Sequence, residues 1–173
     1  MLHFRRGDCS MYLAELRGKL SSRVERMEDI LTSNVFSFFK YSARDIFLKG
    51  YLNKLEIEVS NREAEEAKFR FWPVFEDGTE PDLVIIVCNY YLLIEAKYFS
   101  EFSSGTEKNE SQLLRELKNG KLEAKNYNKE YKLIAITADY YYKKDKFEVI
   151  PQNFVLILNG PIGNRSLHLL IIF

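Results

Sequence analysis

The apolar positions near the start of the chain follow the pattern of an amphipathic helix. Between residues 10 and 31 they recur at intervals of three or four residues, and charged side chains occupy the other faces. The apolar set is Tyr12, Leu16, Leu20, Val24, Met27 and Leu31. This spacing places them on one side of a helix. We therefore predict a helix over 10–31 that buries this side, with Asp8 or Ser10 as its N-cap.

Two more helices are predicted within residues 32–55. Thr32 or Ser33 is expected to cap a short helix, because both side chains accept hydrogen bonds from the first turn. Its predicted buried side chains are Val35, Phe36, Phe39 and Tyr41. A further helix is predicted at about Ala43–Leu55, with Ile46, Phe47, Tyr51 and Leu55 as its apolar residues. These aromatic residues recur at helical spacing, which favours a place in the core over a role in stacking bases.

Apolar runs in the middle of the chain predict three strands. Phe69–Phe75 alternates as a strand does, and its proline favours an edge position or a bulge. The turn Glu76–Thr79, where glycine supplies a positive φ, leads into the apolar run Asp82–Val87. Cys88-Asn89 then forms a two-residue loop to Tyr90–Ala96, because Asn tolerates the positive φ of a tight turn. The three strands are expected to form an antiparallel meander.

The second half of the chain predicts a helix between two parallel strands. A polar segment follows residue 97 and is expected to be a loop next to the end of the third strand, where a candidate site is described below. The next helix is predicted at about Glu107–Tyr127, with Gly120 as a weak point, and a buried strand at Tyr131–Ala138. A strand–helix–strand connection of this length implies a right-handed parallel crossover. Phe154–Leu158 and Leu167–Phe173 are predicted as further strands, joined by a turn-rich segment.

Composition narrows the class of protein. At 173 residues, the chain has the length of one domain, 1–173, with ordinary globular proportions of apolar and charged residues. Its 25 basic and 25 acidic residues cancel, which excludes binding of nucleic acid through bulk charge but permits a local basic patch. Cys9 and Cys88 fit no metal-site spacing and are expected to be free thiols. Without a membrane-length apolar run or a signal peptide, a soluble cytoplasmic protein is expected.

The predicted hairpin brings two acidic residues together. If Cys88-Asn89 is the loop, Val87 pairs with Tyr90, and counting outward places Asp82 opposite Glu95. Side chains alternate along a strand, so Glu95 and Lys97 share the face that carries Asp82. Opposed like charges destabilise a hairpin unless a positive charge lies between them. Mg²⁺ fits this need, because it binds one or two carboxylates together with substrate phosphate.

A Glu and a Lys two residues apart are also common on any solvated sheet face, so this pair alone is weak evidence. Its context strengthens it: Pro81-Asp82 begins one apolar strand, and Glu95-Ala96-Lys97 ends its partner. This arrangement resembles the PD-(D/E)xK nuclease superfamily over roughly residues 23–138. The resemblance implies a restriction-endonuclease-like α/β fold, a three-layer α-β-α sandwich with a mixed central sheet. Its parts would be N-terminal helices 10–55, a catalytic hairpin 82–97, helix 107–127 and strand 131–138.

The resemblance also implies an activity and assigns roles to residues. It implies a Mg²⁺-dependent nuclease, with Mn²⁺ as an alternative ion, that hydrolyses phosphodiester bonds, with DNA as the expected substrate and RNA left open. Asp82 and Glu95 would bind the metal, and Lys97 would assist the attacking water. Glu28 from the first helix would reach the site, with Asp29 as the alternative, and Gln112 would face it from the later helix. By themselves, acidic residues such as Glu28 are more simply read as a solvated turn.

Other functions stay open at this point. A nuclease-fold module that has lost catalysis and binds nucleic acid or a protein is the main alternative, and a structural assembly subunit is a third. The lysines along the other side of the helix 107–127 are most simply a solvated face, and a phosphate-contacting role for a few of them stays open; they are Lys118, Lys121, Lys125 and Lys129. Tyrosines beside lysines in 139–146 would suit base stacking or a packed loop equally. A two-fold homodimer would suit cleavage of both strands of a duplex.

Overall fold

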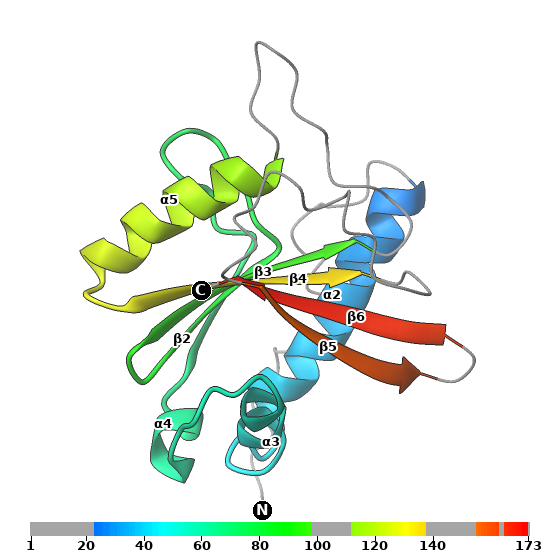
Figure 1. Ribbon diagram of the computed structural model, residues 1–173, viewed down its shortest axis with the longest axis vertical. Helices are drawn as coiled ribbons and strands as arrows, with labels where there is room; N and C mark the ends of the chain where they lie inside the picture. The colour runs from blue at the N-terminus through cyan, green and yellow to red at the C-terminus, as the bar shows by residue number, and fades with distance from the viewer. Residues whose placement is uncertain (1–22, 98–111, 138–154, 163–164, 173) are drawn as a thin grey trace, which may run out of the picture.

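The computed structural model describes residues 23–97, 112–137, 155–162 and 165–172 (Figure 1). The helices are α2 (Arg23–Tyr41), α3 (Phe47–Lys54), α4 (Asn61–Glu65) and α5 (Gln112–Asn126). The strands are β1 (Lys68–Phe71), β2 (Leu83–Val87), β3 (Tyr90–Lys97), β4 (Glu130–Thr137), β5 (Val155–Ile162) and β6 (Arg165–Ile172). The predicted helical turns before residue 23, the loop after residue 97 and the segment 139–146 lie outside the described residues.

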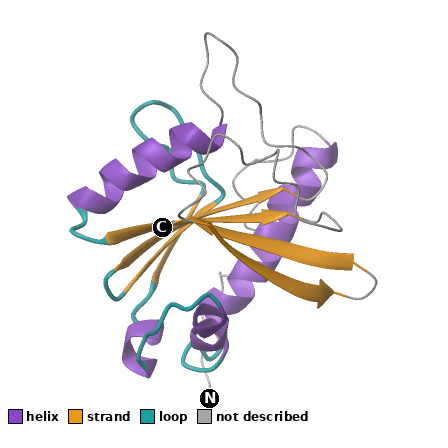
Figure 2. Cartoon of the chain, viewed as in Figure 1, coloured by secondary structure: helices purple, strands orange, loops and turns teal. Residues whose placement is uncertain are grey.

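The strands form one mixed sheet in the order β1-β2-β3-β4-β6-β5 (Figure 2). The predicted antiparallel meander is confirmed, because β2 pairs antiparallel with both β1 and β3. β4 pairs parallel with β3 after the α5 connection, as predicted. β6 and β5 then extend the sheet as an antiparallel hairpin. The fold is therefore mixed α/β.

The first described helix is continuous where a break was predicted. α2 runs through Thr32 and Ser33, which are 2% and 0% exposed instead of capping a new helix. Neither residue is Gly or Pro, and Ser or Thr inside a helix costs only about 0.7 kcal/mol or less relative to Ala. The predicted buried face was also partly wrong, because Leu31 and Val35 are exposed whereas Phe36 is buried. The side of α2 that faces the sheet is therefore the side that contains Phe36, and not the side predicted from Leu31 and Val35.

Three strand and turn boundaries also differ from prediction. β1 ends at Phe71 because Trp72 adopts a positive φ of 48°, so the strand does not reach Phe75. In the β2–β3 loop the positive φ of 50° belongs to Cys88, not to Asn89. β5 and β6 extend through the segment predicted as a wide turn, and Ile162 pairs directly with Arg165. By contrast, Gly78 has the positive φ that was predicted, at 81°.

The two faces of the sheet pack against different helices (Figures 1 and 2). Alternation along β2 and β3 sends Leu83 and Ile94 into a cluster with residues of α2, α3 and α4. Their neighbours Val84 and Leu93 enter a second cluster with residues of α5. Burying each of these aliphatic side chains contributes roughly 1.5–3 kcal/mol, so both faces stabilise the sheet. Within the described part of the chain, every helix is too short or too polar to cross a bilayer.

Candidate active site

Asp82 and Glu95 meet at one end of the β2–β3 hairpin. Leu83 pairs with Ile94, so the register continues to Asp82 opposite Glu95, as predicted. The backbone N–H of Ala96 donates to Asp82 Oδ2 over 2.8 Å, and the backbone N–H of Asp82 donates to Glu95 Oε2 over 3.3 Å. Each carboxylate therefore accepts a hydrogen bond from the other strand. These reciprocal bonds hold the two carboxylates next to each other on the sheet.

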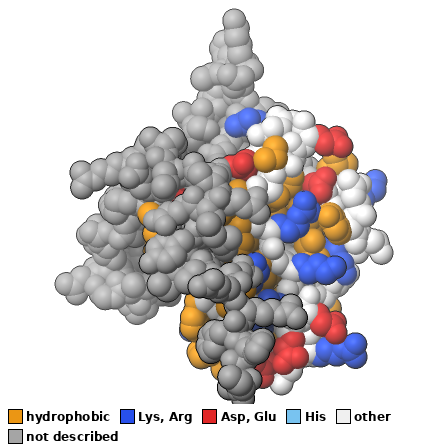
Figure 3. Space-filling view, turned by 180° about the vertical axis from the view of Figure 1, so that it is seen from behind, with side chains coloured by type: hydrophobic (Ala, Val, Ile, Leu, Met, Phe, Trp, Pro, Cys, Tyr) orange, Lys and Arg blue, Asp and Glu red, His pale blue; other side chains and the backbone are white. Residues whose placement is uncertain are grey.

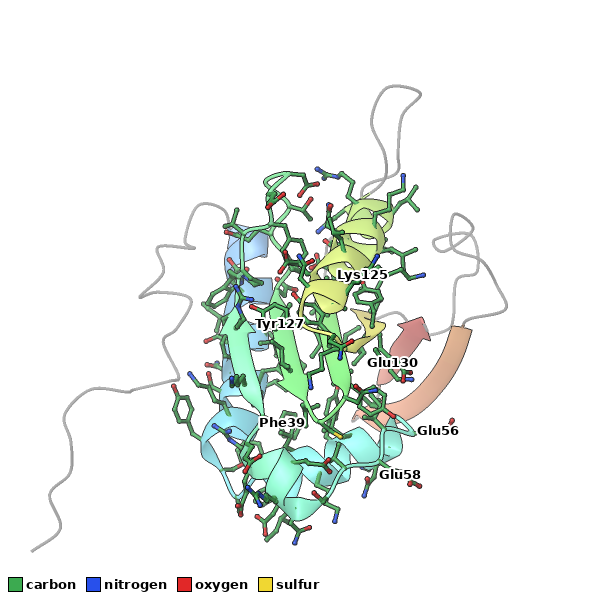
Figure 4. The ribbon with its side chains drawn as sticks, turned by 90° about the vertical axis from the view of Figure 1, so that its left-hand side faces the viewer. Phe39, Glu56, Glu58, Lys125, Tyr127 and Glu130 are labelled. Carbon is green, nitrogen blue, oxygen red and sulfur yellow. The ribbon has the colours of Figure 1, made fainter. Side chains whose placement is uncertain are left out.

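The pair faces the layer that contains α5. Alternation places Asp82 with Val84, and Glu95 with Leu93, and both apolar partners pack against α5. Glu95 is only 1% exposed, whereas Asp82 is half-buried. Figure 4 shows α5 lying alongside the central strands on this face. The site therefore lies between the end of β3 and the start of α5.

Gln112, the first residue of α5, connects Glu95 to a third acidic residue. Its side-chain Nε2 donates to Glu95 Oε1 over 2.6 Å and to Glu116 Oε1 over 2.9 Å. Glu116 is fully buried. Both hydrogens of one amide group thus bind carboxylates, which fixes the direction in which the amide points. The sequence prediction of Gln112 near the site agrees with this geometry.

Glu116 was missed by sequence analysis, although the sequence holds a signal for it. It lies four residues after Gln112, a spacing that places two side chains on the same side of a helix. It also falls between Leu113 and Leu117, which are buried. A charged residue inside an apolar helical stripe is unusual enough to mark a buried polar contact.

The turn before Asp82 is attached to α5 as well. Asn119 Nδ2 donates to Asp77 Oδ2 over 2.6 Å, and Thr79 donates to Asp77 from its backbone N–H and its hydroxyl. The pKa of the Asp77 carboxyl is lowered, first by the bonds from Thr79 and less by Asn119 and the charge of Arg115. This turn therefore positions the chain as it enters β2 next to the site.

The opposite end of the hairpin is held by α4. The pKa of Glu63 is lowered to about 2 by a hydrogen bond from the Cys88 thiol and then by bonds from Ser60. Ser60 N–H donates to Glu63 Oε2 over 2.7 Å, and Glu63 N–H donates to Ser60 Oγ over 3.2 Å. This capping box thus anchors the Cys88 loop, while Asp82 and Glu95 stand at the other end of the same hairpin.

For the remaining predicted residues, Lys97 and Glu28, the structure describes only the strand or helix to which each belongs. Lys97 is the last residue of β3, two positions after Glu95, and its backbone pairs with Thr137. Glu28 belongs to α2, which packs on the sheet face opposite to α5. The side chains of Lys97 and Glu28 lie outside the described ones. Of the predicted site residues, the described contacts therefore join Asp82, Glu95 and Gln112.

The oxygen donors at the hairpin suit the predicted Mg²⁺ only in part. Among the described side chains, no group of three or more His, Cys, Asp or Glu residues has the arrangement of a metal site. Asp82 and Glu95 nevertheless provide two hard oxygen donors. Mg²⁺ commonly takes one or two carboxylates and fills its other positions with water and substrate phosphate. The pair fits this partial type of coordination and does not fit a site made of protein ligands alone.

Comparison of the chain with protein-family models, with curated proteins and with solved structures gave no match.

Proposed function

We propose that this protein is a Mg²⁺-dependent nuclease that hydrolyses phosphodiester bonds, with DNA as its substrate. One observation carries the proposal: Asp82 and Glu95 are opposed across the hairpin and bonded to each other's strands. Two neighbouring carboxylates on a buried face gain stability from a cation between them. The order Pro-Asp, then Glu-x-Lys on the next strand, supports the same chemistry and a restriction-endonuclease-like, three-layer arrangement.

In this proposal each residue has a separate task. Asp82 and Glu95 hold the ion, whereas Glu28, whose helix packs on the opposite face of the sheet, is not assigned to it. Gln112 keeps the Glu95 carboxylate in one orientation through its 2.6 Å bond. Lys97 orients the attacking water and stabilises negative charge as it develops, since a compact ammonium suits that position. When bound, Mg²⁺ polarises the scissile phosphate and lowers the pKa of its water.

A cleavage assay tests the proposal. We expect the protein to cut plasmid DNA with Mg²⁺ and not with EDTA, and parallel reactions with single-stranded DNA and RNA define the substrate. Lys97→Ala should reduce the rate by a factor on the order of 10²–10³, the loss that follows removal of one charge-stabilising group. A Lys97→Ala protein that cuts as fast as the parent would remove Lys97 from the mechanism. No cleavage of any of the three substrates would refute the nuclease.

A second candidate function is a nucleic-acid-binding or protein-binding module that has lost catalysis. It is favoured by the contacts of Glu95, whose two oxygens already accept bonds from Gln112 and Asp82, and by the two-carboxylate donor set. Such a module would bind nucleic acid equally well in Mg²⁺ and in EDTA and would cut none. The same assay, combined with a binding measurement in EDTA, distinguishes the two functions.

A further inference from the structure

Exposed basic side chains form a stripe along the outer side of α5. The stripe consists of Arg115, Lys118, Lys121 and Lys125, all exposed. They follow one another at intervals of three, three and four residues, which keeps them on one side of the helix. The opposite side of α5 is buried against the sheet. We refer to these four residues as the α5 basic stripe.

The stripe ends at a shallow hollow between α5 and the β2–β3 loop. The hollow has a volume of about 330 Å³ and is lined by Asn89, Lys121, Lys125, Asn128, Lys129 and Glu130. Lys129 Nζ donates to the backbone oxygen of Cys88, and Glu130 lies 3.3 Å from Lys132 Nζ. Figure 4 shows Lys125 on α5 above Glu130 at the start of β4. The one acidic side chain of the hollow is therefore paired, and the hollow is positive.

Without a bound anion, the positive charges of the α5 basic stripe repel one another and destabilise the helix. Lys121 and Lys125 are four residues apart, and like charges at this spacing destabilise a helix by about 0.2–0.5 kcal/mol. The helix dipole compensates for Lys125, which lies in the last turn, but its effect fades within one turn and does not reach Lys118. Elsewhere the visible described surface carries charges of both signs side by side (Figure 3). A run of one sign on α5 is thus a local feature that an anionic partner would stabilise.

The position of the stripe relates it to the candidate active site. α5 begins at Gln112, which contacts Glu95, and Lys125 follows thirteen residues later. A helix rises 1.5 Å per residue, so the two ends are about 20 Å apart. The phosphates of one DNA strand advance about 3.4 Å per nucleotide, and the same distance spans roughly six of them. A strand that has one phosphate at the site can therefore place others along the stripe.

We propose that the α5 basic stripe and its hollow bind the phosphate backbone of the nucleic acid whose scissile bond lies at Asp82 and Glu95. The inference rests on the proposed function, since it assigns a binding surface to that substrate. Phosphates and surface lysines make contacts that carry no sequence information, so the stripe supplies affinity and not sequence recognition.

The test is a binding measurement without metal, so that no cleavage can occur. The affinity for a labelled DNA duplex of about 20 base pairs is measured by fluorescence anisotropy in EDTA at several salt concentrations. Lys121→Gln/Lys125→Gln is compared with the parent and with Lys54→Gln/Lys68→Gln, which removes the same charge from exposed positions on α3 and β1. Glutamine retains high helix propensity, so the test variant should remain folded.

Loss of two phosphate contacts should lower the slope of log affinity against log salt by roughly 1.8 and weaken binding, while the control keeps the slope of the parent. The inference would be overturned if parent and test variant had equal slopes, or if the control lost as much slope and affinity as the test variant. A parent that does not bind the duplex would also overturn it. Asp82→Asn separates it from the proposed function. That variant should bind in EDTA at least as well as the parent, whether or not the parent cleaves DNA in Mg²⁺.

Discussion

At the scale of single residues, the candidate site is held in place before any ligand arrives. Glu95 accepts bonds at both oxygens, from the Gln112 amide and from the backbone of Asp82. Asp82 is fixed in turn by the Ala96 N–H. Ordering a glutamate side chain costs up to about 2 kcal/mol of conformational entropy. Because this cost is met when the protein folds, it does not reduce the affinity for a ligand.

One residue far from the site gives the clearest dependence of stability on pH. The pKa of Glu63 is about 2 in the folded protein, below its usual value of 4.5, because the Cys88 thiol and Ser60 donate hydrogen bonds to its charged form. A lowered pKa stabilises the folded state above pH 4.5, and this contribution is lost as the pH falls towards 2. We expect Glu63→Gln to have a smaller free energy of unfolding than the parent at neutral pH, with that difference reduced to roughly half or less at about pH 3 and nearly gone near pH 2.

Urea unfolding at neutral and acidic pH measures this effect. Glu65→Gln is the matched control, because it removes the same charge from the same helix and leaves the contacts of Ser60 and Cys88 intact. The control should show no comparable change with pH. A difference between Glu63→Gln and the parent that is as large at pH 3 as at pH 7 would contradict the assignment.

At the scale of elements, α5 is fitted to β4 at one small residue. Gly120 is buried, and a Cβ atom added there would lie 2.7 Å from the hydroxyl oxygen of Tyr131. The same hydroxyl donates to the backbone oxygen of Glu116 over 3.1 Å. This close contact sets the position of α5 over the sheet. It thereby sets the positions of Glu116 and Gln112, which lie about one and two turns nearer to the site.

Two glycine substitutions test the fit between α5 and β4. Replacing glycine by alanine inside a helix stabilises the helix by about 1 kcal/mol, but overpacking a core destabilises the protein by about 1–3 kcal/mol. Gly120→Ala should therefore destabilise the protein or leave it unchanged at best, because the ring of Tyr131 must move. Gly50→Ala on α3, where the added Cβ meets nothing within 4 Å, should stabilise the protein by up to about 1 kcal/mol.

Thermal unfolding of both variants gives the comparison. If Gly120→Ala were stabilised as much as Gly50→Ala, the contact between Gly120 and Tyr131 would not restrict α5.

Local sequence signals predicted some of these elements and missed others. The β2–β3 hairpin and the parallel β3–β4 pair follow from short apolar runs, turn residues and the length of the connection, which are local properties. The continuity of α2 through Thr32 was not predictable in this way, since only its packing against the sheet decides whether a threonine caps or continues a helix. Glu116 shares a helix face with Gln112, but it joins the site only because Gln112 also contacts Glu95 on β3, a long-range contact that local spacing does not reveal.

At the scale of the whole molecule, the sheet separates two layers with different tasks. α2, α3 and α4 cover the face that carries Leu83 and Ile94, and their contacts are mainly apolar. The other face carries Asp82, Glu95 and Glu116 at the end where α5 begins, beside an apolar cluster that continues along the helix. Among the described residues, the two buried carboxylates, Glu95 and Glu116, thus lie together at one end of this face.

If Asp82 and Glu95 bind a divalent cation, as proposed, Mg²⁺ should stabilise the folded protein against heat. The melting temperature is measured in excess Mg²⁺ and in EDTA for the parent, Asp82→Asn and the control Asp45→Asn, whose carboxylate precedes α3. At an ion concentration about 100-fold above Kd, binding stabilises the folded state by about 2.7 kcal/mol, which raises the melting temperature by several degrees. We expect this rise in the parent and in Asp45→Asn, and none in Asp82→Asn, with similar melting temperatures for all three in EDTA. An equal rise in Asp82→Asn and the parent, or no rise in the parent, would contradict the proposed cation site.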